Sequence, residues 1–504
     1  MKKLNLTIYL IEKNQNNLEK IALIYIEDEN EFRIYSYKEI FEKIEIVANF
    51  CMAKGFQKGD KILLRLPSDP SMIFCFLGCI LSGLVPIPIS SMLTNKEVEF
   101  LVMDSQCKGI FYNKKMTKLD IVPQNSIQII DTEEIFTIPK LFSFPETYTE
   151  DPAFMVYTSG TTGFPKGVIH AQRNILGRIP IQKEWINIQP DDILLHSGEL
   201  NWTYTLGVGI MDVFSNQATA ILVGSIRKDP TLWTKIIKKL NVSIFATVPS
   251  LYRRILKYSE SSLKNLSSIR HCLSAGEELN LELYKHWTNR IQKPLFEALG
   301  MTEISTYISS GYNVPTKMGS PGKPQKGRII RIIPEDNSST EEVEVGKVGL
   351  IAVHRTDLGL MLQYHNRIEE EKKVYRESWF IGGDLAYRDE EGYYWYMGRN
   401  NDIIKSFGYR VSPLEIEKVL NQHPHILESA VCGIHKDDFM ILITAFVVKK
   451  DNRALTEKEI IQYCKLFLAE YKCPKKVIFL KNLPRNSSGK ILKKELKKMY
   501  DYKI

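Results

Sequence analysis

The sequence predicts an α/β protein with a large N-terminal domain and a small C-terminal domain. Short apolar runs rich in Val and Ile lie at 61–66, 218–223 and 243–248. Helical patterns at 230–240 and 250–258 alternate with them. Because such alternation is typical of layered α/β architecture, we expect sheets whose strands are largely parallel.

The N-terminal segment and the most apolar run are both expected to belong to the globular fold. The N-terminus starts like a signal peptide but reaches Glu12 and Lys13 before a full apolar core or a small-residue cleavage site. Ser82 and Pro86 interrupt the apolar run at 72–85 before it reaches a membrane-spanning length. We expect a first helix, then a buried helix followed by a strand, and no membrane span.

The sequence pattern changes in the last third of the chain. Strand-like segments at 323–354 are separated by a polar loop at 334–342, which predicts a smaller antiparallel subdomain. A hairpin follows, with its expected turn at 389–392. The rest of the chain is long enough for one small α+β domain. The predicted domains are residues 1–399 and 400–504.

Composition limits the classes of partner. The chain is 44% hydrophobic and 25% charged, as is ordinary for a globular protein. The net charge is +8, but no basic stripe carries interleaved aromatics or a recognisable module, so nucleic acid is not an expected partner. A basic surface favours anionic small molecules. The eight cysteines include no Cys-x-x-Cys pair, which indicates reduced core residues in a cytoplasmic protein.

A loop dense in glycine and hydroxyl side chains follows the apolar strand that begins at Met155. Gly160 and Gly163 free the backbone to turn N–H groups inward, the hydroxyls add donors, and Lys166 adds a point charge. The P-loop of NTPases does not fit, because Pro165 stands where that motif needs its second glycine. The expected phosphate-binding residues are Thr158, Ser159, Gly160, Thr161, Thr162, Gly163 and Lys166.

Residues 158–167 resemble the signature loop of the adenylate-forming superfamily, which includes acyl-CoA synthetases, peptide-synthetase adenylation domains and luciferases. Further segments recur in the order that this family uses, over essentially the whole chain. The resemblance implies that ATP is a cofactor. It also implies an N-terminal domain of two αβ-layered sheets with a small β-barrel-like subdomain, and a small, mobile α+β C-terminal domain that carries the catalytic lysine.

Two segments resemble the parts of the family site that bind adenine and ribose. The tight turn after a predicted strand implies that Gly276, Glu277 and Glu278 line the adenine pocket; the alternative is a plain strand-to-helix turn. Asp384 matches the family aspartate that accepts both ribose hydroxyls, and Arg399 matches the arginine that contacts ribose and phosphate. As isolated residues, these two could equally form a surface ion pair.

The segment 297–303 resembles the family motif that ends in Gly-x-Thr-Glu. A carboxylate beside a triphosphate is unfavourable unless a hard cation lies between them, and Mg²⁺ takes oxygen ligands. Glu303 is thus the predicted Mg²⁺ ligand, and Thr302 is expected to donate to the α-phosphate. Gly300 and Met301 are expected to line the substrate pocket.

The stretch from His196 to Tyr204 belongs to the part of the chain that forms the acyl pocket in relatives. Trp202 and Tyr204 are expected as walls that close the pocket to long chains, although aromatic side chains are more often core residues. His423 and His425 have metal-like spacing, but no acidic or cysteine partner accompanies them. A structural role is the better interpretation for that pair.

The C-terminal domain supplies the remaining predicted roles. Asn401 aligns with the family hinge, where Asp or Lys is usual, and Asn can adopt unusual backbone angles at low cost. Gly408 and Tyr409 resemble the segment beside the pantetheine tunnel of coenzyme A. Lys490 matches the catalytic lysine, whose ammonium group bridges the attacking carboxylate and the α-phosphate. The alternative for Lys490 is a solvated basic tail.

Together these residues predict an AMP-forming acid–thiol ligase with Lys490, Thr302 and Glu303 as catalytic residues. A carboxylate attacks the α-phosphate of Mg·ATP to give an acyl-adenylate and pyrophosphate, and a thiol then displaces AMP. Coenzyme A is the favoured thiol. The favoured substrate is a short, medium-chain or aromatic acid, since the motif segments look most like medium-chain and benzoate-type acyl-CoA ligases.

Two alternatives stay open. The enzyme could instead load the phosphopantetheine of a carrier protein, or the chain could be a catalytically silent nucleotide-binding protein. A pure binder would not need Lys490, which counts against the second alternative. The oligomeric state also stays open, with a homodimer considered.

Overall fold

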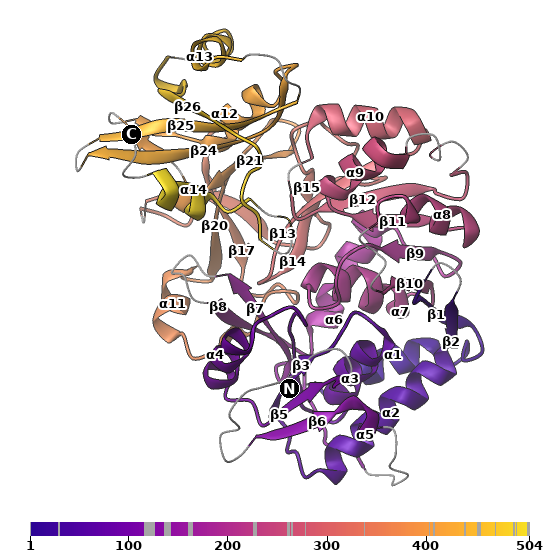
Figure 1. Cartoon of the computed structure of the whole chain (residues 1–504). Helices are drawn as coiled ribbons and strands as arrows, with labels where there is room; N and C mark the ends of the chain where they lie inside the picture. The colour runs from indigo at the N-terminus through magenta and orange to yellow at the C-terminus, as the bar shows by residue number, and fades with distance from the viewer. Residues whose placement is uncertain are drawn as a thin grey trace.

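The computed structural model describes residues 2–28, 31–114, 127–135, 143–159, 165–224, 229–259, 263, 266–277, 279–336, 338–402, 404–406, 409–437, 440–450, 455–468, 470–486, 489 and 491–500. Figure 1 shows a smaller sheet with its helices at the bottom, a larger sheet on the right and the C-terminal domain at the top left.

The larger layer is a nine-stranded sheet in the order β15-β14-β13-β12-β11-β9-β10-β1-β2. The strands from β13 to β1 pair in parallel, and antiparallel strands flank them at both edges. Helices α8 (Leu232–Lys239), α9 (Pro249–Ser259) and α10 (Leu281–Ile291) cover one face around Trp233 and Trp287. The strands are β1 Ile21–Ile26, β2 Phe32–Ser36, β9 Ile193–His196, β10 Thr219–Val223, β11 Ile244–Thr247, β12 His271–Ala275, β13 Leu295–Met301, β14 Ser305–Ser309 and β15 Lys323–Pro324.

The second layer is a parallel four-stranded sheet in the order β4-β3-β5-β6. The most apolar run of the sequence forms α3 (Pro70–Leu81), which begins after Asp69, whose side chain accepts from the Ser71 amide. It is followed directly by a strand, as predicted. Other elements here are α1 Leu6–Asn14, α2 Tyr37–Ala53, β3 Lys61–Arg65, β4 Val85–Pro88, α4 Asn95–Ser105, β5 Gly109–Tyr112, β6 Gln128–Asp131 and α5 Thr132–Ile135.

A three-stranded sheet, β18-β8-β7, carries the predicted phosphate loop between β7 (Pro152–Ser159) and β8 (Pro165–Ala171), and β18 spans Gln363–Tyr364. The helical turns α6 Asn174–Gly177, η1 Ile181–Ile186, η2 Thr205–Met211 and α7 Asp212–Ser215 lie between β8 and β10 in the sequence.

The predicted antiparallel subdomain is a five-stranded sheet. Its strands are paired antiparallel throughout, and β20 and β21 form the expected hairpin with its turn at 389–392. Its elements are β16 Ile330–Ile333, β17 Gly349–His354, α11 Ile368–Lys373, β19 Tyr375–Arg376, β20 Trp379–Arg388 and β21 Tyr394–Arg399.

The last part of the chain has its own apolar core, centred on Ile416, Val431 and Ile443. This agrees with the predicted α+β C-terminal domain, and the predicted fold class is confirmed. The boundary at residue 400 stays a prediction. Its elements are η5 Asn400–Asp402, β22 Ile404–Ser406, β23 Tyr409–Val411, α12 Pro413–Leu420, β24 Ile426–Asp437, β25 Met440–Lys449, α13 Glu457–Lys465, η6 Glu470–Lys472, β26 Lys476–Leu480 and α14 Lys493–Tyr500.

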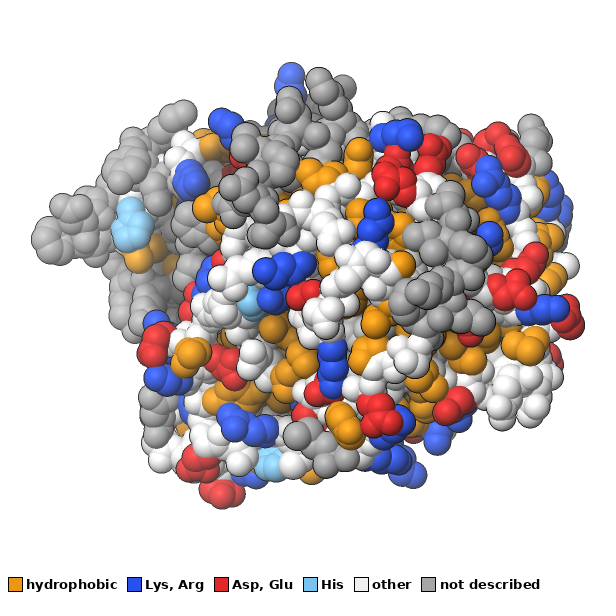
Figure 2. Space-filling model, turned by 90° about the horizontal axis from the view of Figure 1, so that it is seen from below, with side chains coloured by type: hydrophobic (Ala, Val, Ile, Leu, Met, Phe, Trp, Pro, Cys, Tyr) orange, Lys and Arg blue, Asp and Glu red, His pale blue; other side chains and the backbone are white. Residues whose placement is uncertain are grey.

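On the face shown in Figure 2, acidic and basic side chains are interspersed among the described residues. All eight cysteines are buried and free. Within the described ranges, none of the helices has the length and apolar character needed to cross a membrane.

Candidate active site

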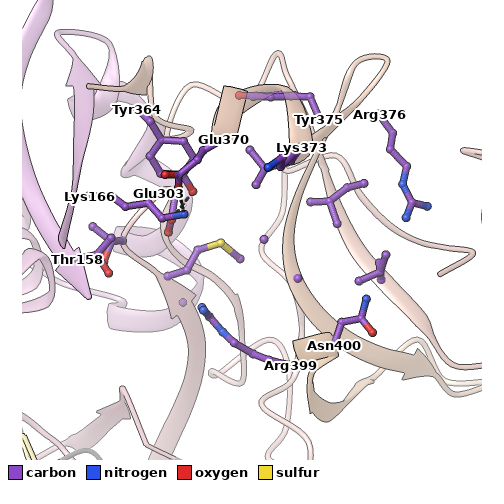
Figure 3. Close-up of a pocket in the computed structure, with 18 of the residues that line it drawn as sticks. Thr158, Lys166, Glu303, Tyr364, Glu370, Lys373, Tyr375, Arg376, Arg399 and Asn400 are labelled. Atoms are coloured by element: carbon purple, nitrogen blue, oxygen red, sulfur yellow. Dashed lines mark hydrogen bonds and ion pairs between the residues drawn. The ribbon is translucent and has the colours of Figure 1, made fainter. Parts of the chain in front are cut away.

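A pocket of about 1060 Å³ opens at the carboxyl ends of β12 and β13. Ligands bind at the carboxyl ends of strands in open α/β sheets, because the loops there diverge and leave a crevice. The β7–β8 hairpin lines one side, and strands β20 and β21 of the antiparallel subdomain line another. Figure 3 shows Lys166, Glu303, Tyr364 and Glu370 gathered at one side of this pocket.

The structure brings many of the predicted site residues together. The predicted residues that line the pocket are Thr158, Lys166, Tyr204, Gly276, Gly300, Met301, Thr302, Glu303 and Arg399. His196, Trp202, Glu277 and Asp384 lie outside its lining. The predictions that fall outside the described residues are Gly160, Thr161, Thr162, Gly163, Glu278, Gly408 and Lys490, and the side chains of Ser159, Asn401 and Tyr409.

Lys166 is held at the pocket by an acidic side chain that the sequence analysis missed. Its Nζ lies 2.5 Å from Glu370 Oε2 and 5.2 Å from the centre of the Tyr364 ring. Thr158 pairs with Lys166 across the β7–β8 ladder, so both flank the phosphate loop. Glu370 comes from α11, far along the sequence, and no local motif marks it. An incoming phosphate would compete with this carboxylate for the ammonium group.

Hydrogen bonds to both the backbone and the side chain of Glu303 fix its orientation. The Tyr364 hydroxyl donates to Glu303 Oε1 at 2.7 Å, and the Met361 amide donates to the Glu303 carbonyl at 2.6 Å. Burial raises the pKa of Tyr364, so its hydroxyl stays a donor. Tyr364 is a second residue that the sequence analysis did not name.

The donor set fits a Mg²⁺ ion that is shared with phosphate. Glu303 offers a hard carboxylate oxygen at the pocket wall, beside Lys166. The described residues contain no cluster of three or more acidic, histidine or cysteine side chains that could cage a metal by themselves. Mg²⁺ is commonly held by one or two carboxylates with waters and substrate phosphates, so this sparse set suits it.

Asp384 and Arg399 face each other across the β20–β21 ladder. Asp384 is 3% exposed, and its Oδ1 lies 3.3 Å from Arg399 Nε and accepts from the Tyr396 hydroxyl at 3.2 Å. The charge of Asp384 raises the pKa of Arg399. Asp384 is buried and the Arg399 side chain is 37% exposed, so the pair is half-buried rather than fully on the surface, and only its Arg399 member lines the pocket.

Comparison with known proteins decides the family. Residues 10–365 match the AMP-binding enzyme family, and residues 415–490 match the AMP-binding enzyme C-terminal domain. The chain belongs to the AMP-binding enzyme family. The predicted resemblance to adenylate-forming enzymes is thereby confirmed.

The similarity extends over nearly the whole chain. The uncharacterized acyl–CoA ligase YtcI of Bacillus subtilis (strain 168) is 30% identical over 497 residues, which cover 95% of this chain and 93% of the relative. The 3-hydroxybenzoate–CoA ligase of Aromatoleum sp. (strain CIB) is 27% identical, over 93% of this chain and 92% of that one. The crystal structure of ATP-bound MatB from Rhodopseudomonas palustris superposes with a TM-score of 0.88 at 25% identity, covering 99% of each chain.

In this AMP-binding enzyme, Gly276 and Glu277 of the predicted adenine loop lie in different surroundings. Gly276, at φ +86°, lines the pocket. The Glu277 carboxylate turns to the start of α9, where it accepts from the Ser250 amide at 3.1 Å and the Ser250 hydroxyl at 2.9 Å. Burial raises the pKa of Glu277. Glu277 thus contacts helix α9, which precedes it in the sequence, while the following helix α10 begins only at Leu281, and the role of Glu277 at adenine stays a prediction.

The C-terminal domain packs onto this same loop. Gly489 lies so close that a Cβ there would be 3.4 Å from Glu277 Oε1. Arg485 acts on the Glu277 carboxylate as a nearby positive charge. Gly489, which directly precedes the predicted catalytic lysine in the sequence, thus borders the turn that lines the pocket.

The predicted acyl wall is an aromatic stack. Tyr204 lines the pocket, with Trp185 stacked behind it at 5.9 Å and the His196 ring set edge-on at 4.3 Å. Burial lowers the pKa of His196 to about 3, so this ring is neutral. Trp202 is half-buried and lies outside the lining. Of the predicted aromatic walls, the structure thus places Tyr204 at the pocket and His196 behind it.

Proposed function

We propose that this protein is an AMP-forming acid–CoA ligase that activates a short, medium-chain or aromatic carboxylic acid. The observation that carries the proposal is the single pocket in which Lys166, Glu303 and Arg399 meet the aromatic wall at Tyr204. Cationic and acidic groups for Mg·ATP therefore adjoin an apolar wall for an acid. ATP, Mg²⁺ and coenzyme A are the expected small-molecule partners.

The reaction follows from these positions in two steps. First, a carboxylate oxygen of the acid attacks the α-phosphorus, and the bond to the β-phosphate oxygen breaks to release pyrophosphate. Lys166 binds the departing pyrophosphate, Thr302 donates to the α-phosphate, and Arg399 binds the ribose and phosphate. Mg²⁺, held by Glu303 and the phosphates, would neutralise charge there. Lys490 bridges the acid and the α-phosphate.

In the second step, the coenzyme A sulfur attacks the acyl carbonyl, AMP leaves, and the thiol proton goes to solvent. Gly408 and Tyr409 remain the predicted neighbours of the pantetheine arm, and Asn401 remains the predicted hinge for the domain rotation between the steps. Asp384 remains the predicted ribose ligand. These assignments rest on the family membership.

The acid is expected to be compact. Tyr204 is backed by Trp185 and His196, which leave it little freedom to swing aside and admit a long chain. The relatives include a 3-hydroxybenzoate–CoA ligase, which supports an aromatic acid. The eight free, buried cysteines support a cytoplasmic location. A homodimer stays a prediction.

The test is ATP–pyrophosphate exchange with a panel of acids. Exchange that depends on one class of acid is expected, and its absence with every acid would favour the silent nucleotide-binding protein. Thioester formation with coenzyme A, compared with a carrier protein, separates the two ligase alternatives.

The variant Lys490→Ala tests whether Lys490 is catalytic or only part of a solvated basic tail. Exchange should fall at least roughly 100-fold, because the charge that bridges two anions is lost. Thioester formation from supplied acyl-AMP should stay near wild type. The matched control is Lys498→Ala, a lysine of the same tail on α14, which should leave both half-reactions unchanged. Equal losses in both half-reactions would show that the assigned division between the steps is wrong.

A further inference from the structure

His170 lies on β8 close behind the phosphate-loop lysine. Side chains alternate between the faces of a strand, so His170 and Lys166 lie on the same face of β8. The ring is 2% exposed and stacks on Phe154 at 4.7 Å and 21°. No role for this histidine follows from the proposed reaction, yet both of its nitrogens are engaged.

The hydrogen bonds fix the tautomer of His170. Asn174 Nδ2 lies 3.1 Å from His170 Nδ1, and an amide nitrogen only donates, so Nδ1 is the acceptor. The Nε2 atom therefore carries the proton and donates to the Thr302 carbonyl at 2.9 Å. Burial, followed by the positive charges of Arg178 and Arg173, lowers the pKa of His170 to about 4. The ring is neutral near pH 7.

The peptide that this ring holds is the one that joins Thr302 to Glu303. The next peptide, which joins Glu303 to Ile304, is held by the segment 358–361, whose Met361 amide donates to the Glu303 carbonyl. The same stretch of chain as His170 fixes that segment too. Arg173 donates to the carbonyls of Leu358 at 2.8 Å and Leu360 at 2.9 Å, and Asn174 donates to that of Gly359 at 3.3 Å.

We propose that His170 is a positioning residue for Mg·ATP. Its Nε2–H holds the Thr302–Glu303 peptide in place, so that the Thr302 hydroxyl and the Glu303 carboxylate are presented to phosphates bound beside Lys166. Strand β8 thus carries the lysine proposed to bind pyrophosphate and also positions the turn that carries the proposed Mg²⁺ ligand. The inference rests on the proposed function, because it assumes that Mg·ATP occupies this pocket.

Two variants of His170 differ mainly in the proposed contact. In His170→Gln the side-chain amide nitrogen can take the place of Nε2 and still donate to Thr302. In His170→Asn it can reach only the place of Nδ1, so that bond is lost. Binding of ATP is measured by isothermal titration calorimetry with and without Mg²⁺, in the absence of acid, so that no reaction occurs.

We expect His170→Asn to raise the dissociation constant of Mg·ATP about tenfold, as for one lost hydrogen bond to a constrained group. His170→Gln should change it about twofold or less, and ATP without Mg²⁺ should respond weakly to either variant. The control is His271→Gln, another buried neutral histidine that lies outside the pocket lining, which should leave Mg·ATP binding unchanged.

Equal Mg·ATP binding by His170→Asn and wild type would overturn the proposal. So would equal losses in the Gln and Asn variants, which would indicate packing alone. If His170→Asn does not fold, Asn174→Ala, which frees the ring to turn but keeps its N–H, should weaken Mg·ATP binding about twofold, and no change would overturn the proposal. Failure of the proposed function is distinct, since wild type would then lack exchange with every acid.

Discussion

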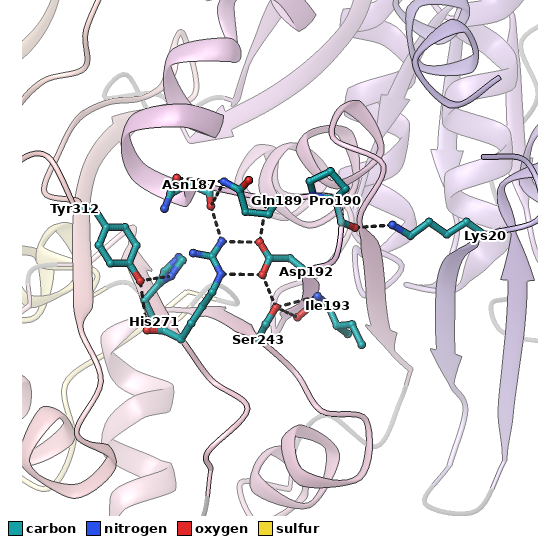
Figure 4. Close-up of polar contacts among 10 residues, drawn as sticks. Lys20, Asn187, Gln189, Pro190, Asp192, Ile193, Ser243, His271 and Tyr312 are labelled. Atoms are coloured by element: carbon teal, nitrogen blue, oxygen red, sulfur yellow. Dashed lines mark hydrogen bonds and ion pairs between the residues drawn. The ribbon is translucent and has the colours of Figure 1, made fainter. Parts of the chain in front are cut away.

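The two ends of the nine-stranded sheet differ in how most of their buried polar side chains are paired. At the amino ends of β9, β11 and β12, Asp192 receives hydrogen bonds from Arg270, Ser243 and the Gln189 amide at 2.5 to 2.8 Å (Figure 4). At the carboxyl ends, the buried atoms His196 Nε2, Ser274 Oγ and Thr306 Oγ1 have no hydrogen-bond partner among the described residues.

The difference distinguishes a structural cluster around Asp192, at the amino end, from a candidate ligand site at the carboxyl end. Burial alone would raise the pKa of Asp192, but the bonds from Arg270, Ser243 and Gln189 outweigh it and lower the pKa. A buried polar group costs free energy unless it is paired, and Asp192 at the amino end meets that condition internally, whereas His271 Nε2 at the same end has no hydrogen-bond partner among the described residues. At the carboxyl end, the unpaired Thr306 lines the pocket, which suits an end of the sheet that binds a ligand.

The largest effect is expected at the amino end, on stability. Asp192→Ala leaves the Arg270 guanidinium without its buried partner and should lower the free energy of unfolding by about 3 kcal/mol. The folded fraction should keep its wild-type rate of ATP–pyrophosphate exchange, because the cluster does not line the pocket. Urea unfolding and exchange measured on the same sample check both parts. Loss of exchange in fully folded protein would show that the contrast between a structural amino end and a functional carboxyl end is wrong.

The reverse pattern is expected at the carboxyl end. Glu303→Gln removes the charge proposed to bind Mg²⁺ and should lower exchange roughly 100-fold, about 2.7 kcal/mol in the barrier. The free energy of unfolding should change by less than about 0.5 kcal/mol, since the Gln oxygen can still accept from Tyr364. Glu391→Gln, on an exposed turn, serves as the control.

Acid should lower the free energy of unfolding, because each end of the sheet holds a buried histidine that takes up a proton more readily in the unfolded chain. The pKa of His196 is lowered to about 3 and that of His271 to about 4, mainly by burial, against about 6.5 in the unfolded chain. Their contribution to stability is therefore complete above about pH 6.5 and is lost as the pH falls toward 4. Each should add a slope of about 1.4 kcal/mol per pH unit in that window.

Urea unfolding at several pH values, with His271→Gln beside wild type, measures that slope. The variant should lose the slope of one proton and keep that of His196. An unchanged slope would mean that His271 is charged in the folded protein.

The smallest effect is expected at the lysine of the phosphate loop. Glu370→Gln removes the carboxylate that pairs with Lys166, so ATP no longer competes with it, and the KM for ATP should fall about twofold, within the range of a partly exposed ion pair. Steady-state kinetics at saturating acid check this. A raised KM would show instead that Glu370 holds Lys166 in its working orientation.

Local patterns allowed much of the fold and part of the site to be predicted. Alternating apolar runs indicated the parallel sheets, and the glycine-rich loop with Lys166 indicated phosphate. Glu370 and Tyr364 were not predictable in this way, because each meets its partner across a long stretch of chain and neither belongs to a local motif. For Glu277, the residue type does not reveal its partner, because Ser250 lies 27 residues earlier in the sequence.

What the sequence determined by itself is the chemistry available to the protein: a phosphate loop, a Thr302–Glu303 turn and a lysine near the C-terminus, in an order that identifies the family. Spacing along the chain specifies these elements because each is built from neighbouring residues. Only the tertiary structure decided how they are held. The hydrogen bond from His170 to Thr302 and the ion pair between Lys166 and Glu370 join segments far apart in the sequence, and they exist because β8 shares an apolar core with β14 and the antiparallel subdomain.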